Sequence, residues 1–177
     1  MENGEITRTG KLKNLAVMFL IALSVFAVDQ LSKLWIRNNL KLREVIKPIP
    51  AIGDWFRIVH WKNTGVAFGL FQGNGWILTI VGIVVVIGII IYSVKITDSP
   101  LYLRIALALE LGGAMGNLAD RLNPELGYVV DFIWIGNFPV FNLADSAIVL
   151  GAIVLIIGMW RQESSDQSSV VSDQSEE

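Results

Sequence analysis

Four apolar runs of about membrane length constrain this chain more than any other feature. A spanning helix needs about 20 mostly apolar residues, and the first run reaches that length if it continues past Asp29 toward Trp35. The chain is 53% hydrophobic with a mean hydropathy of +0.56, which is too apolar for an ordinary soluble domain. The sequence therefore predicts an all-α membrane protein with four transmembrane helices, over 14–28, 76–94, 101–119 and 142–160.

The polar connections predict one membrane domain with two tails. Residues 1–13 read as an N-terminal tail, and 161–177 as a disordered acidic tail that is too polar to bury a core. Between the first two helices lies an insertion over about 36–75. Its run WFRIVHW is rich in aromatic and β-branched residues and predicts a small β-sheet at the membrane surface. The Gly- and Phe-rich stretch 65–75 predicts a short interfacial helix. The domain itself covers 14–160.

Several kinds of chemistry are excluded by residue type. The first apolar run lacks a small-residue cleavage site after it, so it predicts a retained helix rather than a signal peptide. The chain has no cysteine, which excludes disulfides and thiolate chemistry. Its one histidine, His60, cannot form an HExxH zinc site and is predicted to be an interfacial side chain. No metal or organic cofactor is expected.

Two aspartates, Asp131 and Asp145, stand beside apolar runs in the stretches VVDFI and FNLADSAI. Ionisable groups at membrane depth are costly, so they usually face a bundle interior and mark a working site. In a chain of four alternating spans, the ends that carry polar side chains all fall on one side of the membrane. The sequence therefore predicts a single polar site built from Asp29, Lys33, Asn63, Asn117, Asp120, Arg121, Asp131, Asn142 and Asp145.

Each of these groups also has a purely structural interpretation. Asn142 followed three residues later by Asp145 is the pattern of a helix N-cap with an acid in the first turn. Glu110 lies in the middle of the third run, where it is either protonated or hydrogen-bonded inside the bundle. The remaining candidates are an i,i+4 pair (Asp29 and Lys33), an ion pair (Asp120 and Arg121) and a helix-packing stripe (Ala108, Gly112 and Gly116).

Two close carboxylates can hydrolyse a peptide bond without cysteine, histidine or metal. Such a pair shares a proton, so one member can take a proton from the attacking water while the other protonates the product side. Asp145 feels the positive end of its helix, which leaves Asp131 to carry the shared proton. The alternatives are an ion- or proton-coupled transporter, which would favour mid-membrane carboxylates, and a non-enzymatic assembly factor, which would not need the pair.

Five sequence blocks in a fixed order resemble the signature blocks of the lipoprotein signal peptidase (signal peptidase II) family. They are DQLSK at 29–33, NTGVAFG at 63–69, GGAMGNLADR at 112–121, GYVVDF at 127–132 and FPVFNLAD at 138–145. The loop at 122–126 is longer than the family pattern, and the acidic tail lies outside it. The resemblance implies a fold of four transmembrane helices with a small extracytoplasmic sheet and an interfacial helix.

The resemblance also implies a function. It predicts a bacterial intramembrane aspartyl endopeptidase, which removes the signal peptide from diacylglyceryl-modified prolipoproteins by cutting before the lipidated cysteine. Expected partners are these substrates, membrane lipid and the inhibitor globomycin, with no nucleic acid, and the protein is expected to be a monomer. Asp131 and Asp145 match the catalytic dyad. The residues that match those lining or bracing the site are Asp29, Lys33, Asn63, Gly65, Asn117, Asp120, Arg121 and Asn142.

Orientation follows from the resemblance alone. It implies a multi-pass protein of the bacterial inner membrane with both termini in the cytoplasm and the site near the extracytoplasmic face. Charge does not support this directly, because three basic residues precede the first run whereas seven lie within 33–62. The positive-inside rule is therefore ambiguous here, or even opposed to this orientation.

Overall fold

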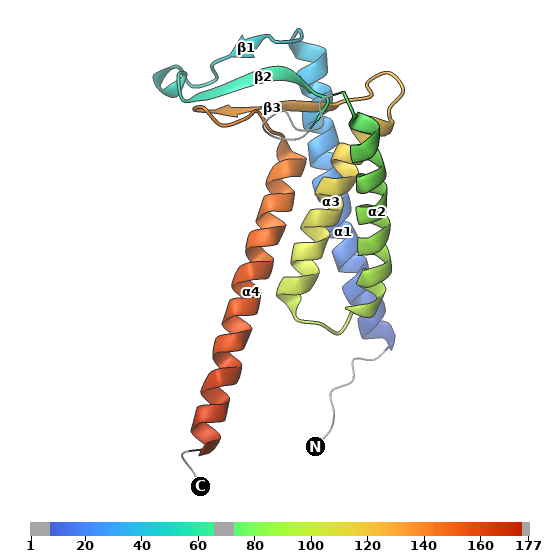
Figure 1. Cartoon of the computed structure of the whole chain (residues 1–177), viewed down its shortest axis with the longest axis vertical. Coiled ribbons are helices and arrows are strands. Elements are labelled where there is room, and N and C mark those ends of the chain that lie inside the picture. Colours follow the sequence, from blue (N-terminus) through green and yellow to red (C-terminus); the bar gives the residue numbers. More distant parts are fainter. Residues whose placement is uncertain (1–7, 66–72, 175–177) are drawn as a thin grey trace.

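Four long helices run from a small β-sheet at one end of the molecule, and the first helix begins and the last helix ends at the opposite end (Figure 1). The computed structural model describes residues 8–65 and 73–174. The interfacial helix expected within 65–75 falls mainly on residues 66–72, which lie outside the described residues. The helices are α1 (Arg8–Asn39), α2 (Gly75–Lys95), α3 (Leu101–Leu122) and α4 (Leu143–Gln174).

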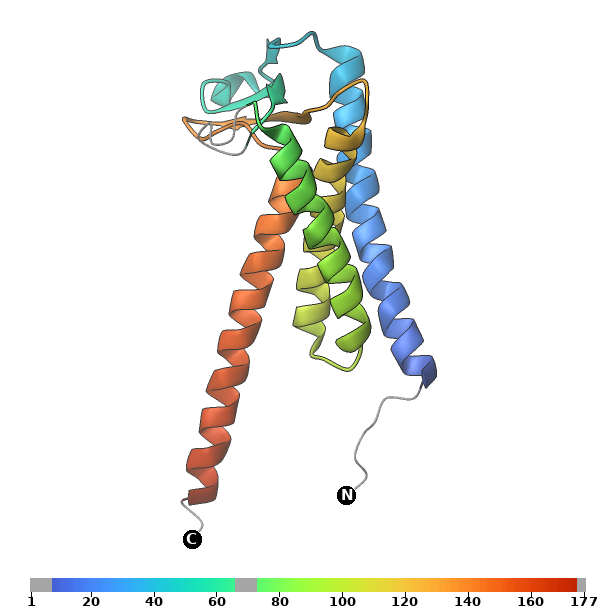
Figure 2. The same cartoon turned by 45° about the vertical axis from the view of Figure 1, so that its right-hand side comes forward.

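Helix α3 is the central element of the bundle, because it packs against α1, α2 and α4 (Figures 1 and 2). Among the described residues, α1, α2 and α4 are long and apolar enough to cross a membrane. Three of the four predicted spans are therefore confirmed by helix length and apolar composition. Helix α3 has 22 residues but carries polar side chains, including the buried Asn117 and Asp120. Because protein surrounds it, its polar groups face partners rather than lipid.

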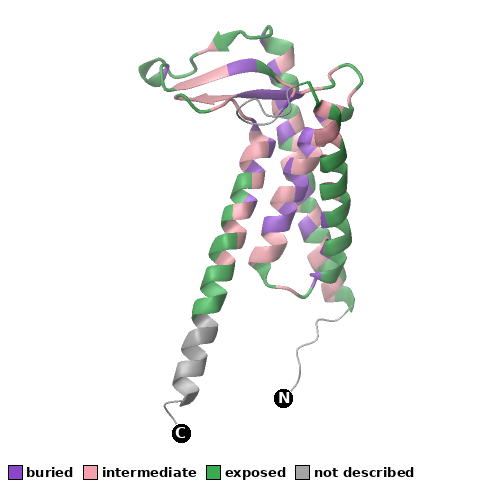
Figure 3. Ribbon diagram, in the orientation of Figure 1, coloured by how far each residue is buried: buried purple, intermediate pink, exposed green. Residues whose placement is uncertain are grey.

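Exposed apolar side chains cover the outer faces of α2 and α4 (Figure 3). Val84 of α2 is 64% exposed and Ile156 of α4 is 66% exposed. Apolar surface of this extent fits contact with lipid rather than water. The buried core lies instead on the inner faces of α1, α2 and α3, around Leu111. The molecule is a multi-pass membrane protein.

The sheet has three antiparallel strands in the order β1 (Val45–Ile46), β2 (Phe56–Asn63) and β3 (Val129–Ile135), with a short 3-10 turn η1 (Pro50–Ile52) before β2. The sequence predicts a sheet within 36–75 only, so strand β3, which lies outside that segment, was not predicted. It comes from the connection between α3 and α4. The pairing of β2 with β3 joins segments that are distant in sequence, which local residue patterns do not reveal.

Two helix ends also differ from the sequence-based expectation. Helix α1 begins at Arg8 rather than near 14, and its first turns are held by an ion pair of 2.6 Å between Lys11 and Asp98. Helix α4 continues to Gln174, where the sequence predicts a disordered tail after residue 160. Adding residues to a formed helix gains one hydrogen bond for each residue fixed, so a polar segment can extend it.

Candidate active site

Asp131 lies in the middle of β3 and is only 1% exposed. Both oxygens of its carboxylate accept hydrogen bonds from side-chain amides. Asn63 Nδ2 donates to Oδ2 at 2.8 Å, and Asn142 Nδ2 donates to Oδ1 at 2.7 Å. Asn63 ends β2, and β2 pairs with β3 with Trp61 opposite Asp131. The sheet therefore holds Asp131 and its first amide partner on one frame.

Asp145 lies in the first turn of α4 and forms a reciprocal cap with Asn142. The backbone N–H of Asn142 donates to Asp145 Oδ2 at 3.1 Å, and the backbone N–H of Asp145 donates to Asn142 Oδ1 at 2.9 Å. This is the geometry of a capping box, so the interpretation of Asn142 and Asp145 as a helix N-cap with an acid in the first turn is confirmed. The other carboxylate oxygen accepts a hydrogen bond of 2.7 Å from Asn117 Nδ2.

Asn142 joins the two aspartates. It is fully buried, and its side-chain amide donates to Asp131 while its backbone N–H donates to Asp145. The same Nδ2 also lies 3.0 Å from the side-chain oxygen of Asn117 and 3.4 Å from the backbone oxygen of Val130. An amide has two N–H groups, so the longest of these contacts is the weakest. One residue thus sets the relative positions of both carboxylates.

A buried ion cluster lies behind the aspartates. Lys33 Nζ is 2.8 Å from Asp29 Oδ2, 3.1 Å from Asp120 Oδ2 and 3.0 Å from the side-chain oxygen of Asn117. The three charged side chains are at most 2% exposed. An ammonium group has three donors, and all three have acceptors here. Removing Lys33 would leave two buried carboxylates without their counter-charge, which is strongly destabilising.

The ion cluster is bonded to the backbone on both sides of the aspartate pair. Asp29 Oδ1 accepts a hydrogen bond of 3.0 Å from the N–H of Ala144 in α4, and Asp120 Oδ2 accepts one of 3.0 Å from the N–H of Val130 in β3. Ala144 precedes Asp145, and Val130 precedes Asp131. The cluster therefore fixes each catalytic candidate through its neighbouring residue.

Three glycines of α3 allow the close helix packing that this cluster needs. A Cβ at Gly112 would lie 2.6 Å from the backbone oxygen of Ala22 in α1, and a Cβ at Gly113 would contact the backbone oxygen of Ala144 in α4 at 2.5 Å. A Cβ at Gly116 would overlap the carboxylate of Asp29. The small-residue stripe expected from the sequence thus lies at helix contacts, as such stripes do in membrane proteins.

The environment of Asp131 favours its protonated form. Burial, together with the negative charge of Asp145, raises the pKa of Asp131 from its ordinary value of 3.8 to about 7. Hydrogen bonds from Asn63 and Asn142 and the charge of Lys33 act in the opposite direction. Desolvation of the carboxylate is the largest effect. A proton is therefore available on this side chain near neutral pH.

A cavity of about 660 Å³ opens beside the pair. Asp145 lines it, and Asp131 is hydrogen-bonded to Asn63, which lines it too. Arg121 also faces the cavity, where its Nη2 lies 3.4 Å from the backbone oxygen of Gly65. Polar groups gather at the aspartate end. The other lining residues are the polar Asn117 and Ser146 and the apolar Val129, Phe138, Pro139, Val140, Phe141, Ile148, Val149 and Leu150.

All ten site candidates from the sequence meet at this end of the bundle. Two of them are the carboxylates, three form the ion cluster and the rest supply amides, a guanidinium group or the loop at Gly65. Glu110 lies elsewhere on α3, against Gly151 of α4. His60 is buried rather than interfacial, with Nδ1 2.9 Å from the backbone oxygen of Leu40. Among the described residues, no three metal-ligating side chains come together.

Sequence reasoning did not single out Gln30. Its Nε2 is 3.3 Å from Asp29, 3.1 Å from Asp120 and 3.1 Å from the backbone oxygen of Gly116, so it links α1 to α3 within the ion cluster. Adjacent residues on a helix point in different directions, so spacing gave no reason to group Gln30 with Asp29. The aromatic wall at Phe138 and Phe141, whose rings pack edge to face, was also missed.

Comparisons with known proteins agree on one family. A family model described as signal peptidase (SPase) II matches residues 21–161. The lipoprotein signal peptidase of Moorella thermoacetica is 49% identical over 139 residues, which are 77% of this chain and 87% of that protein. The lipoprotein signal peptidase of Pseudomonas aeruginosa (strain UCBPP-PA14) is 38% identical over 174 residues, covering 93% of this chain and 98% of that one.

A solved structure of a bacterial membrane enzyme has the same fold. It superimposes with a TM-score of 0.76 at 31% sequence identity, covering 85% of this chain and 91% of that one. The resemblance read from the five sequence blocks is thus confirmed by matches that extend over most of the chain. The chain belongs to the signal peptidase II family of lipoprotein signal peptidases.

Proposed function

We propose that this protein is an intramembrane aspartyl endopeptidase, which removes the signal peptide from diacylglyceryl-modified prolipoproteins and cuts before the lipidated cysteine. The observation that carries the proposal is the pair Asp131 and Asp145, held by Asn142 beside a cavity. Membership of a signal peptidase family supports the peptidase class.

In the proposed mechanism, the pair shares one proton. Asp131, with a pKa of about 7, holds the proton before reaction. Asp145 is then the general base that takes a proton from water as the water attacks the scissile carbonyl carbon. Asp131 gives its proton to the carbonyl oxygen, and a proton later passes to the leaving amine. Holding both carboxylates on one residue, Asn142, is proposed to keep them in reach of the same water, which lowers the entropic barrier.

The surrounding residues have positioning roles in this mechanism. Lys33 and Asn117 form a hydrogen-bonded path from the ion cluster to Asp145, with contacts of 3.0 and 2.7 Å. Asn63, Gly65 and Arg121 face the cavity and are proposed to contact the substrate backbone. Arg121 would also balance the charge of an ionised Asp145. Family members act without a metal or organic cofactor by the resemblance, and we propose the same here.

The lining of the cavity is consistent with a lipidated substrate. Its apolar wall includes Val149 and Leu150 of α4, which are 58% and 53% exposed and so continue onto the lipid-facing surface. An acyl chain could pass from the bilayer along this wall while the peptide reaches the polar end. Globomycin is expected to occupy the same cavity.

We propose that α3 is a fourth transmembrane span and that the protein is a monomer in the bacterial inner membrane. Both termini would lie in the cytoplasm, as the family resemblance implies; that α1 begins and α4 ends opposite the sheet is consistent with a shared side (Figure 1). The sheet and site would then lie near the extracytoplasmic face. A transporter is less consistent with this arrangement, because the buried charged side chains gather at the sheet end rather than along a path through the bundle.

The direct test replaces each aspartate by asparagine and follows release of the signal peptide from a diacylglyceryl-modified precursor. Asp131→Asn and Asp145→Asn should each abolish cleavage, and the double variant should be scarcely worse, because residues that act as a unit are not additive. Membrane insertion of each variant is the control. Near-normal cleavage by a well-inserted single variant would remove the aspartyl mechanism and leave Asp145 as a helix cap only.

A further inference from the structure

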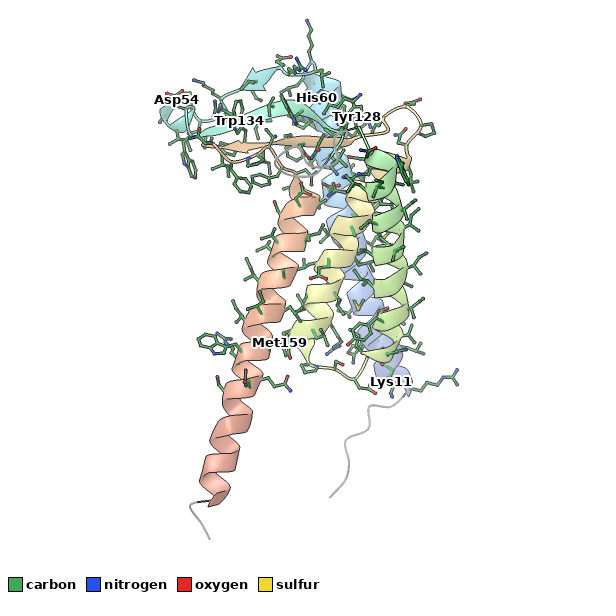
Figure 4. All side chains as sticks on the ribbon, in the orientation of Figure 1. Lys11, Asp54, His60, Tyr128, Trp134 and Met159 are labelled. Carbon is green, nitrogen blue, oxygen red and sulfur yellow. The ribbon has the colours of Figure 1, made fainter. Side chains whose placement is uncertain are left out.

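Four basic residues lie on the chain segments that meet where α1 passes into the sheet. Arg37 lies in the last turn of α1, Lys41 and Arg43 lie in the connection to β1, and Lys62 lies on β2. The backbone N–H of Arg43 donates to the backbone oxygen of His60 at 2.8 Å, which joins the connection to β2. Figure 4 shows His60 and Tyr128 at this corner. We call Arg37, Lys41, Arg43 and Lys62 the basic corner.

Carboxylates do not neutralise the basic corner in the described part of the chain, although Lys62 Nζ makes a cation–π contact, 4.4 Å from the centre of the Tyr128 ring. Lys41, Arg43 and Lys62 are exposed, and within residues 8–65 and 73–174 no carboxylate forms an ion pair with any of the four. The nearby carboxylate of Glu44 instead accepts the backbone N–H of Lys41 at 2.8 Å.

Lys47 differs from these residues although it belongs to the same cap. It is paired at 2.8 Å with Asp54, at the tip of the sheet. Its charge is therefore already balanced within the protein. This makes Lys47 the matched control for any property that depends on unpaired charge.

Two exposed tryptophans give the depth of the basic corner in the membrane. Trp35, two residues before Arg37, is 52% exposed, and Trp61, next to Lys62, is 42% exposed. Exposed tryptophans of membrane proteins lie at the level of the lipid headgroups. The apolar part of α1 ends at the same level, so the basic corner is continuous with the bilayer surface.

We propose that the basic corner binds the phosphates of anionic phospholipid headgroups and so enriches these lipids beside the sheet. Charge complementarity and continuity with the bilayer identify the occupant, since each Lys or Arg near an anionic lipid surface strengthens binding by roughly fivefold. The attraction also accounts for a basic segment on the sheet side, where the positive-inside rule alone disfavours one. The inference depends on the membrane setting and not on peptidase activity.

The test measures lipids bound to the full chain by native mass spectrometry. Detergent-purified protein is given an equimolar mixture of phosphatidylglycerol and phosphatidylcholine. The parent protein should bind the anionic lipid severalfold more. The variant Lys41→Gln/Arg43→Gly/Lys62→Gln should lose most of this preference, and the control Lys47→Gln should keep it. Glycine suits position 43, where φ is +66°. Basic residues at the far end of α1 attract lipid too, so the measured quantity is the difference from the parent.

Three results would overturn the proposal. The parent could bind both lipids equally, the triple variant could keep the full preference, or Lys47→Gln could lose as much as the single variant Lys41→Gln. The last result would mean that the preference for anionic lipid depends on the net charge of the protein and not on a local binding site. About 1 M salt, where the screening length falls to roughly 3 Å, should abolish the preference. If the triple variant fails to fold, the single exposed-site variants Lys41→Gln and Lys62→Gln replace it.

Discussion

Replacing Gly116 of α3 by alanine tests whether the ion cluster positions the aspartate pair. The new methyl group would overlap the Asp29 carboxylate, 3.1 Å from its Cγ, and would also lie 3.2 Å from Ala144 Cβ. Asp29 cannot retreat without lengthening its contacts of 2.8 Å to Lys33 and 3.0 Å to the N–H of Ala144. One methyl group therefore perturbs α1, α3 and α4 together.

The expected loss of stability follows from three contributions. Overpacking costs about 1–3 kcal/mol, and weakening a charge-assisted hydrogen bond costs about 1.5–3 kcal/mol. The gain in helix propensity from glycine to alanine returns about 1 kcal/mol. We therefore expect Gly116→Ala to lower the free energy of unfolding by about 1.5–5 kcal/mol, the range left when the propensity gain is subtracted from the two costs.

Thermal unfolding in detergent and cleavage of a lipidated precursor are the assays. Cleavage should fall beyond the loss of folded protein, because moving Asp29 moves the start of α4 and with it Asp145. The matched control is Gly88→Ala in α2, where no atom lies within 4 Å of the added carbon. That variant should be unchanged or slightly stabilised, by up to about 1 kcal/mol. A Gly116→Ala protein with parental stability and parental kcat/KM would refute the positioning role.

Three further predictions concern pH, backbone strain and orientation. In the proposed mechanism Asp131, with a pKa of about 7, must hold a proton. The value of kcat/KM, measured in nanodiscs at pH 6–9, should therefore be maintained below pH 7 and fall about tenfold per pH unit above it. A flat profile to pH 9 would contradict the shared proton. Arg43→Gly should raise the unfolding midpoint, because φ of +66° costs a non-glycine residue about 1 kcal/mol, whereas Arg43→Ala keeps that strain and should give no gain. Single cysteines at Thr7 and Thr64, probed in intact cells with an impermeant thiol reagent, should label at 64 and not at 7, and the reverse pattern would invert the proposed orientation.

The sequence predicted the helices and the clustering of polar groups because both depend on local pattern. Four apolar runs located α1 to α4 within several residues at most ends. Alternation of spans then placed Asp29, Asn117 and Asp145 at one end of the bundle. These inferences need only helix length and chain direction, which are set by neighbouring residues.

The sequence could not predict the contacts that give the site its geometry. The hydrogen bond from Ala144 to Asp29 joins residues 115 positions apart, and Asn63 meets Asp131 across 68 positions. The strand VVDFIWI at Val129–Ile135 did carry a local signal, since it is rich in β-branched and aromatic residues between Gly127 and Gly136. The pairing of this strand with β2 had no local sequence signal. Register between distant strands is decided by tertiary packing.

The i,i+4 ion pair between Asp29 and Lys33 has a consequence for biosynthesis. Helix α1 leaves the ribosome before α3 supplies Asn117 and Asp120 and before α4 supplies the N–H of Ala144. An unpaired charge in a nascent spanning helix raises the free energy of insertion, by about 2.5–3.5 kcal/mol at the helix centre and by less toward a helix end, where Asp29 and Lys33 lie. Because Asp29 and Lys33 lie 2.8 Å apart on the same helix, α1 can enter the bilayer with its charges already neutralised. When α3 and α4 are added, their side chains and backbone bind an ion pair that α1 has already formed.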